Sequence, residues 1–247
     1  MNAMFAKLLR KDLHINRALL LVAVLGLVLP YVLGSLINWY RLYRYNEGQL
    51  WSILLAYAGL WGSGLSILTV TLLSANAVAG ERAERSAEFL ACVPVSRRAI
   101  LASKALVALG ATVVIWLVNV GVVYGLTSRF PPVEPRDMWR SDYRHAPRME
   151  QADVLRARDD VVPVLAFTAL LAWGMAWGCS SLVRSPVLAA GAGVGTPFVI
   201  FMLLAIVASS LPGAAYRLGP WYAVICIILG VAGCAGGTWY YLRRVEP

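Results

Sequence analysis

Charged residues gather between the second and third long apolar stretches of this chain, in the segment 80–104, GERAERSAEFLACVPVSRRAILASK. Acids and bases alternate there at three- and four-residue spacing, which favours an exposed helix face. Apolar side chains at Phe89, Leu90 and Val93 form an edge of the same helix, and Pro94 ends it. A short charged helix of this kind suits binding by a soluble partner. The alternative is a solvated loop whose charges only set orientation in a membrane.

Composition indicates the class of protein that carries this segment. Hydrophobic residues make up 60% of the 247 positions and charged residues only 14%, whereas a soluble domain carries about 25% charge. The chain is therefore expected to be an integral membrane protein. Its net charge of +9 is interpreted as a membrane-topology signal. Nucleic acid is not an expected partner, because no basic helix is interleaved with aromatic residues for base stacking.

Six apolar stretches reach the roughly 20 residues that a helix needs to cross a bilayer. They are Ala18–Ile37, Trp51–Ala79, Ala105–Thr127, Val161–Val183, Val187–Leu211 and Trp221–Leu242. The runs are continuous and lack the alternation of membrane strands, so we predict an all-α bundle of six transmembrane helices forming one transmembrane domain over 1–247. The second stretch exceeds the bilayer thickness, so it tilts, breaks near Gly59, Gly62 and Gly64, or extends into water.

Basic residues orient the predicted spans. An even number of spans places both termini on one side, and all three lysines, Lys7, Lys11 and Lys104, fall on that side. The longest loop on the other side, 128–160, balances seven arginines against seven acids. By the positive-inside rule we expect a multi-pass protein of the inner or plasma membrane with both termini and the segment 80–98 in the cytoplasm. The loop 128–160 then lies outside, where it either caps a path or simply connects two spans.

The N-terminal segment 1–17 has helical periodicity of its own. Met4, Phe5, Leu8 and Leu9 recur on one face, while Lys7, Arg10, Lys11 and His14 project elsewhere. This pattern predicts an amphipathic helix lying in the membrane interface with its cations toward lipid headgroups. The alternative is an ordinary basic flank of the first span.

Ionisable residues are absent from the apolar cores of all six spans, although ion-coupled transporters and pumps usually need them at membrane depth. No GxxxxGK[ST] motif, catalytic pair or metal-ligand pattern occurs. The chain is therefore not expected to be an enzyme or to bind a cofactor, and any uphill transport requires energy from another polypeptide. Mild polar residues within the spans serve as hydrogen-bonding contacts between helices or line a path; for a path, the candidates are Asn119 and Thr196.

The segment 80–104 resembles the cytoplasmic coupling segment of type-2 ABC exporter permeases. Gly80, Glu81 and Arg82 match the opening of that motif, Glu88 and Leu90 its middle, Pro94 to Arg97 its end, and Lys104 its downstream lysine. Arg85 and Ser86 depart from the glycine and threonine that the family often has. The segment Lys11 to Arg17 also resembles the family's interface helix, so the resemblance extends over essentially the whole chain.

The resemblance implies a permease that forms half of a membrane dimer, with a second copy or a paralogue. A separate ABC ATPase subunit would carry ATP and Mg²⁺ and contact seven residues: Glu81, Arg82, Glu84, Arg85, Glu88, Pro94 and Arg97. The expected function is ATP-driven export of a substrate that the sequence does not identify. The alternative function is a non-transporting membrane scaffold or sensor subunit.

Overall fold

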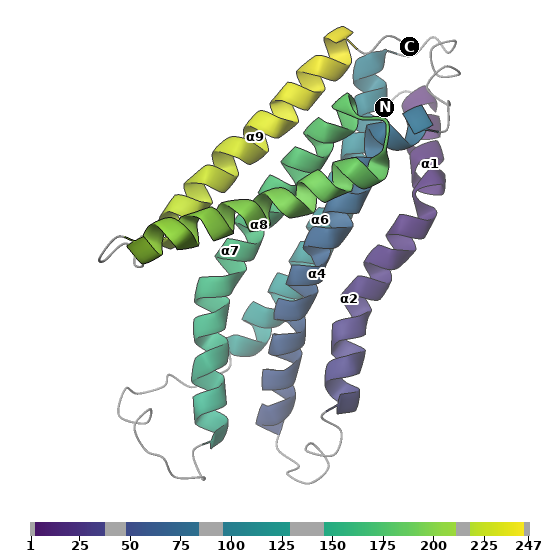
Figure 1. Cartoon of the computed structure of the whole chain (residues 1–247). Coiled ribbons are helices and arrows are strands. Elements are labelled where there is room, and N and C mark those ends of the chain that lie inside the picture. The colour runs from purple at the N-terminus through teal and green to yellow at the C-terminus, as the bar shows by residue number, and fades with distance from the viewer. Residues whose placement is uncertain (1–2, 38–47, 84–95, 129–145, 211–217, 245–247) are drawn as a thin grey trace. The chain divides into compact units, whose positions relative to one another are not determined.

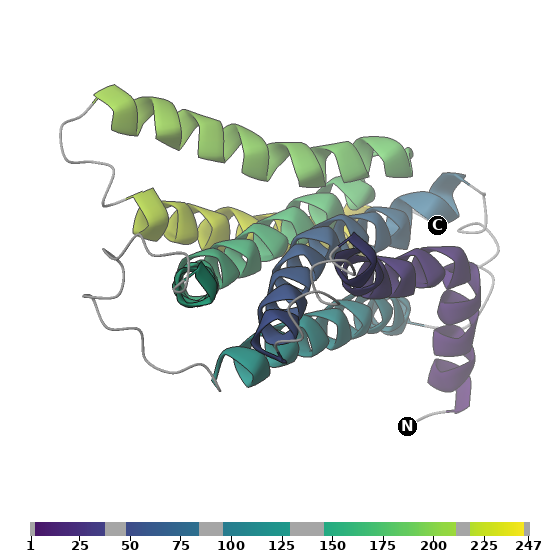
Figure 2. The ribbon, with the colours of Figure 1, turned by 90° about the horizontal axis from the view of Figure 1, so that it is seen from below.

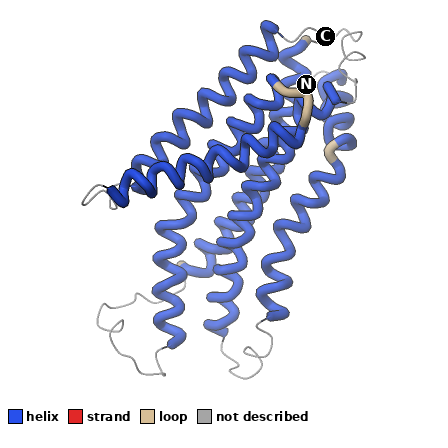
Figure 3. Tube along the Cα trace, viewed as in Figure 1, coloured by secondary structure: helices blue, strands red, loops and turns tan. Residues whose placement is uncertain are grey.

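The computed structural model describes residues 3–37, 48–83, 96–128, 146–210 and 218–244 of the 247-residue chain. Every element in these ranges is a helix (Figure 3), and the described connections, between α1 and α2 and between α7 and α8, are short. In chain order they are α1 (Ala3–Ile15), α2 (Arg17–Ile37), α4 (Gly48–Ala83), α6 (Arg97–Thr127), α7 (Ala146–Leu182), α8 (Pro186–Ser210) and α9 (Leu218–Arg244), as labelled in Figure 1.

All helices except α1 are long and apolar enough to cross a membrane. Continuous runs of apolar side chains without charge produce them, because a helix satisfies its backbone hydrogen bonds internally in lipid. The prediction of an all-α membrane bundle with six spans is confirmed. Two of these spans contain a proline within the helix, Pro30 in α2 and Pro197 in α8.

Two helices run further than the apolar pattern indicated. α4 continues without interruption from Gly48 to Ala83, so the helix does not break near Gly59, Gly62 and Gly64, and tilt and extension into water both stay predictions. α7 begins at Ala146, so the C-terminal part of the predicted loop 128–160 is helical and continuous with the fourth span. A helix, once begun, propagates through polar residues at little cost, which is why hydropathy alone places its ends poorly.

The helices form two compact units. Unit 1 comprises Met1–Val22, Ile67–Val113 and Ala166–Pro247; unit 2 comprises Ala23–Ser66 and Val114–Leu165. Unit 1 therefore holds α1, α8, α9 and the adjoining parts of α2, α4, α6 and α7.

The core of unit 1 joins four helices around the buried indole of Trp177. This ring packs with Ala77, Val78 and Leu101, and its Nε1 donates a hydrogen bond to Thr238 of α9 at 3.2 Å. In the same region α7 approaches α9 closely. A Cβ on Gly174 would collide with the carbonyl oxygen of Gly230 in α9. The small-xxx-small pattern of the sequence thus packs these two helices backbone to backbone.

α8 covers one side of α9 in the same unit. Figure 2 shows the two helices beside each other, and Phe201 meets Tyr222 edge to face with ring centroids 6.0 Å apart. The remaining surface of α8 exposes large apolar side chains such as Leu188, Phe198 and Ile206. An exposed apolar surface of this extent is stable in lipid and not in water.

Unit 2 is held together by two small apolar clusters and by the buried side-chain amide of Asn119. Leu60, Val123 and Val162 form one cluster, which joins α4, α6 and α7. Ile53 and Val154 take part in the other.

Candidate functional site

The C-terminal end of α4 carries the Gly-Glu-Arg opening of the charged segment and lies in unit 1. Glu81 is 7% exposed, although its position in an alternating charge pattern predicted an exposed face. Its Oε1 receives Lys104 Nζ at 2.8 Å and Lys11 Nζ at 2.9 Å. Burial of a carboxylate is costly unless cations and hydrogen bonds compensate it, and two lysines provide that compensation here.

Lys104 also connects Glu81 to a second buried carboxylate. Its Nζ lies 3.7 Å from Asp12 Oδ1, and both side chains are almost fully buried. The Ser103 hydroxyl donates a short hydrogen bond to the other oxygen of Asp12. We call Lys11, Asp12, Glu81, Ser103 and Lys104 the charged cluster. It ties α1, the end of α4 and the start of α6 together through two acids and two lysines, so its formal charge is balanced.

Gly80 allows a further contact between α4 and the junction of α1 with α2. A Cβ at Gly80 would collide with the side-chain oxygen of Asn76 one turn earlier. That amide instead donates a hydrogen bond from its Nδ2 to Asn16 Oδ1 at 2.9 Å. Asn16 is the single residue between α1 and α2. Figure 2 shows that the chain changes direction between these two helices.

Arg82 fixes the same end of α4 to α7. Its guanidinium Nη1 donates to the backbone carbonyl of Ser181 at 2.8 Å. Ser181 is in the last turn of α7, where carbonyl groups lack partners within the helix and the helix dipole favours a cation. Three consecutive motif residues, Gly80, Glu81 and Arg82, therefore link the end of α4 to α1, α6 and α7.

The other predicted partner-contact residues are placed as follows. Arg97 is exposed at the first position of α6. Glu84, Arg85, Glu88 and Pro94 lie outside the described residues. Contact of these residues with an ATPase stays a prediction, and the structure adds that Glu81 is occupied by partners from its own chain.

The two residues predicted to line a substrate path belong to different units. Asn119 is fully buried in unit 2, where its Oδ1 accepts a hydrogen bond from the Tyr31 hydroxyl at 2.9 Å and its Nδ2 donates to the Ile115 carbonyl at 3.0 Å. Thr196 of unit 1 is half-buried and donates to Ala192 of its own helix at 2.7 Å. Asn119 thus acts as a hydrogen-bonding contact between α2 and α6, and its predicted role in a path stays untested.

Sequence reasoning noted Lys104 and the segment around Lys11 but missed the partnership of Asp12 with Lys104. Asp12 is the only acid of α1, and Lys104 directly precedes the apolar stretch Ala105–Thr127. A charge in either setting requires a nearby partner, so these two residues could have been paired by elimination. The described residues hold no group of three His, Cys, Asp or Glu side chains that could bind a metal ion. The contacts of the charged cluster hold the ends of α1, α4 and α6 together.

Comparison with known proteins identifies the family of the chain. Residues 62–218, more than half of the chain, match the family described as ABC-2 family transporter protein. No curated protein and no solved structure matches the chain. The matched range contains the C-terminal part of α4 with the Gly80–Arg82 motif, and the complete spans of α6, α7 and α8. The chain therefore belongs to the ABC-2 family of membrane transporter proteins.

Proposed function

We propose that this protein is the membrane-spanning half of an ATP-driven exporter, with ATP hydrolysed by a separate subunit. Permeases of the ABC-2 family normally work with an ABC ATPase. The sequence supports this division of labour, because the apolar cores of the spans contain no Asp, Glu, Lys, Arg or His with which to couple transport to an ion gradient.

The observation that carries the proposal is the attachment of the motif. The segment 84–95 follows Ala83, the last residue of α4, and the motif residues Glu81 and Arg82 just before it contact α1, α6 and α7. A displacement of that segment by a partner is therefore applied to several helices at once. Because the linking charges are buried, pulling one away from its partners is strongly unfavourable, so the helix ends move together.

The remaining parts of the proposal follow from charge and family. We place both termini and the motif in the cytoplasm of the cell membrane, since the lysines lie on that side. A second copy of the chain, or a paralogue, completes the transporter. Within this scheme Glu81 and Arg82 are positioning residues, and the ATPase contacts the side chains that follow them, Glu84, Arg85 and Glu88, together with Pro94 and Arg97.

The test is co-purification of the tagged protein in mild detergent after expression with its neighbouring genes. We expect a stoichiometric ATPase partner and ATP hydrolysis in the eluate. The variant Glu84→Lys with Glu88→Lys is expected to lose the partner while still inserting into the membrane. Glu81 is left unchanged, because a third lysine in the charged cluster would test folding and not association.

A matched control reverses two exposed acids elsewhere, Asp153→Lys with Asp160→Lys, and is expected to retain the partner. Retention of the partner by the Glu84 and Glu88 variant would contradict the proposed contact. A pure preparation without any ATPase would favour the alternative, a membrane scaffold or sensor subunit.

A further inference from the structure

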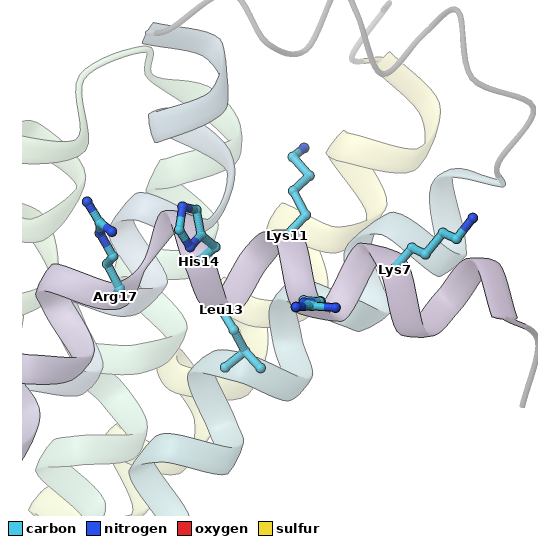
Figure 4. Close-up of a pocket in the computed structure, with 6 residues that line it drawn as sticks. Lys7, Lys11, Leu13, His14 and Arg17 are labelled. Atoms are coloured by element: carbon cyan, nitrogen blue, oxygen red, sulfur yellow. The ribbon is translucent and has the colours of Figure 1, made fainter.

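A groove of about 530 Å³ runs along α1 and is lined almost entirely by cations: Lys7, Arg10, Lys11, Leu13, His14 and Arg17. Figure 4 shows Lys7, Lys11, His14 and Arg17 projecting from one side of the helix, while Leu13 points the other way. Their spacing of three and four residues places them in one row. The row therefore holds three permanent positive charges, on Lys7, Lys11 and Arg17, and Arg10 adds a fourth to the lining of the groove.

No acid of α1 neutralises this row. Asp12, its only carboxylate, is turned inward to Ser103 and Lys104 and is 3% exposed. Like charges at this spacing repel one another, so the groove is suited to an anion that satisfies several cations together. A phosphate group, with its several acceptor oxygens, has that chemistry.

The neighbours of the groove indicate a lipid headgroup as the source of the phosphate. Arg17 is the first residue of the α2 span, so the row ends where the chain enters the apolar region. Leu13 and Ile15 are 44% and 39% exposed beside the cations. Cations next to exposed apolar side chains match the boundary between headgroups and acyl chains, and basic clusters just cytoplasmic of a span recognise anionic lipids.

We propose that the α1 groove binds the phosphate of an anionic phospholipid headgroup, and that this headgroup competes with Glu81 for Lys11. Lys11 belongs to both sites: it lines the groove and lies 2.9 Å from Glu81 Oε1. Its side chain is 34% exposed, so its ammonium group is reached from the groove.

The buried carboxylate tolerates the loss of Lys11. Lys104 contacts the same oxygen of Glu81 at 2.8 Å and remains in place. The headgroup therefore weakens one of the links between α1 and the end of α4 without leaving a buried charge unpaired. Because binding free energies are linked reciprocally, headgroup binding loosens the Lys11–Glu81 pair by the same factor by which that pair weakens headgroup binding.

The first experiment is a titration of the full-length protein in neutral detergent, with the first bound lipid resolved by native mass spectrometry. The probes are phosphatidylglycerol and phosphatidylcholine with identical chains. The variant Lys7→Gln with Arg10→Gln removes two exposed groove cations and is expected to weaken phosphatidylglycerol binding about thirtyfold, since each such cation contributes about fivefold. The matched control, Arg98→Gln with Arg184→Gln, removes two exposed cations outside the groove and is expected to bind as the wild type does.

Equal weakening by both double variants would overturn the site, because the attraction would then come from overall charge. Displacement of phosphatidylglycerol by inorganic phosphate at equal concentration would overturn the assignment to a lipid. The competition is tested separately with Glu81→Gln, which releases Lys11 to the groove and is expected to tighten phosphatidylglycerol binding several-fold while phosphatidylcholine binding stays the same. Unchanged phosphatidylglycerol binding in a monodisperse Glu81→Gln sample would refute the competition.

Discussion

Replacement of Lys104 by methionine is the perturbation that the charged cluster predicts most sharply. Lys104 is the only described cation that contacts both buried carboxylates, at 2.8 Å from Glu81 and 3.7 Å from Asp12. Methionine fills much of the same space without the charge. After the change, Glu81 retains Lys11 and Asp12 retains the Ser103 hydroxyl. Glu81 then keeps one partly exposed lysine, and Asp12 loses the lysine that lay 3.7 Å away.

The magnitude follows from this inventory of partners. Removing one member of a buried ion pair costs roughly 3–5 kcal/mol in unfolding free energy. Because each carboxylate keeps one partner, we expect the lower end of that range, about 3 kcal/mol. For a chain of this size each kcal/mol lowers Tm by about 2–4 °C, so Lys104→Met is expected to melt about 6–12 °C below the wild type.

The assay is thermal unfolding of the purified protein in one detergent at one heating rate, since unfolding of such a protein is often irreversible. Arg98→Met is the control, because Arg98 is exposed, and surface changes stay within about 0.5 kcal/mol. Neutralising both acids as well, with Asp12→Asn and Glu81→Gln in the Lys104→Met background, is expected to recover much of the lost stability. A Lys104→Met protein that melts with the Arg98→Met control would refute the structural role of the cluster.

Three further predictions concern other parts of the chain. Gly174→Ala places a Cβ against a backbone carbonyl of α9 and is expected to cost about 1–3 kcal/mol in thermal unfolding, whereas Gly191→Ala, which faces open space, is expected to cost nothing; equal melting of the two would contradict the backbone contact. Asn119→Ala leaves the tyrosine hydroxyl of α2 without its partner and is expected to lower stability by about 1–3 kcal/mol, with wild-type melting as the contrary result. On a cysteine-free background, a label that does not cross membranes is expected to reach a cysteine at Ser141 in intact cells and not one at Ser86, and the opposite pattern would reverse the topology.

Much of the fold could be predicted because its cause is local. Bilayer thickness requires about 20 apolar residues per span, and six stretches of the sequence meet that length, as the six long helices confirm. The glycine pairs of the fourth and sixth spans, Gly174 with Gly178 and Gly233 with Gly237, have the four-residue spacing that permits close helix packing, and such packing is found between α7 and α9. Helix ends were predicted less well, since Gly48–Ala83 and Ala146–Leu182 both extend beyond their apolar cores.

By itself, then, the sequence determined the class of protein, the number of spans and the register of the charged motif, because hydrophobicity and charge spacing act over a few turns of helix. Only the tertiary structure decided that Glu81 faces inward. Its partners Lys11 and Lys104 come from other helices, one of them 70 positions away, and no local pattern distinguishes a solvated carboxylate from one enclosed by them. Charge alternation describes a helix surface, whereas helix crossing decides which part of that surface is buried, and that depends on contacts between residues far apart in the chain.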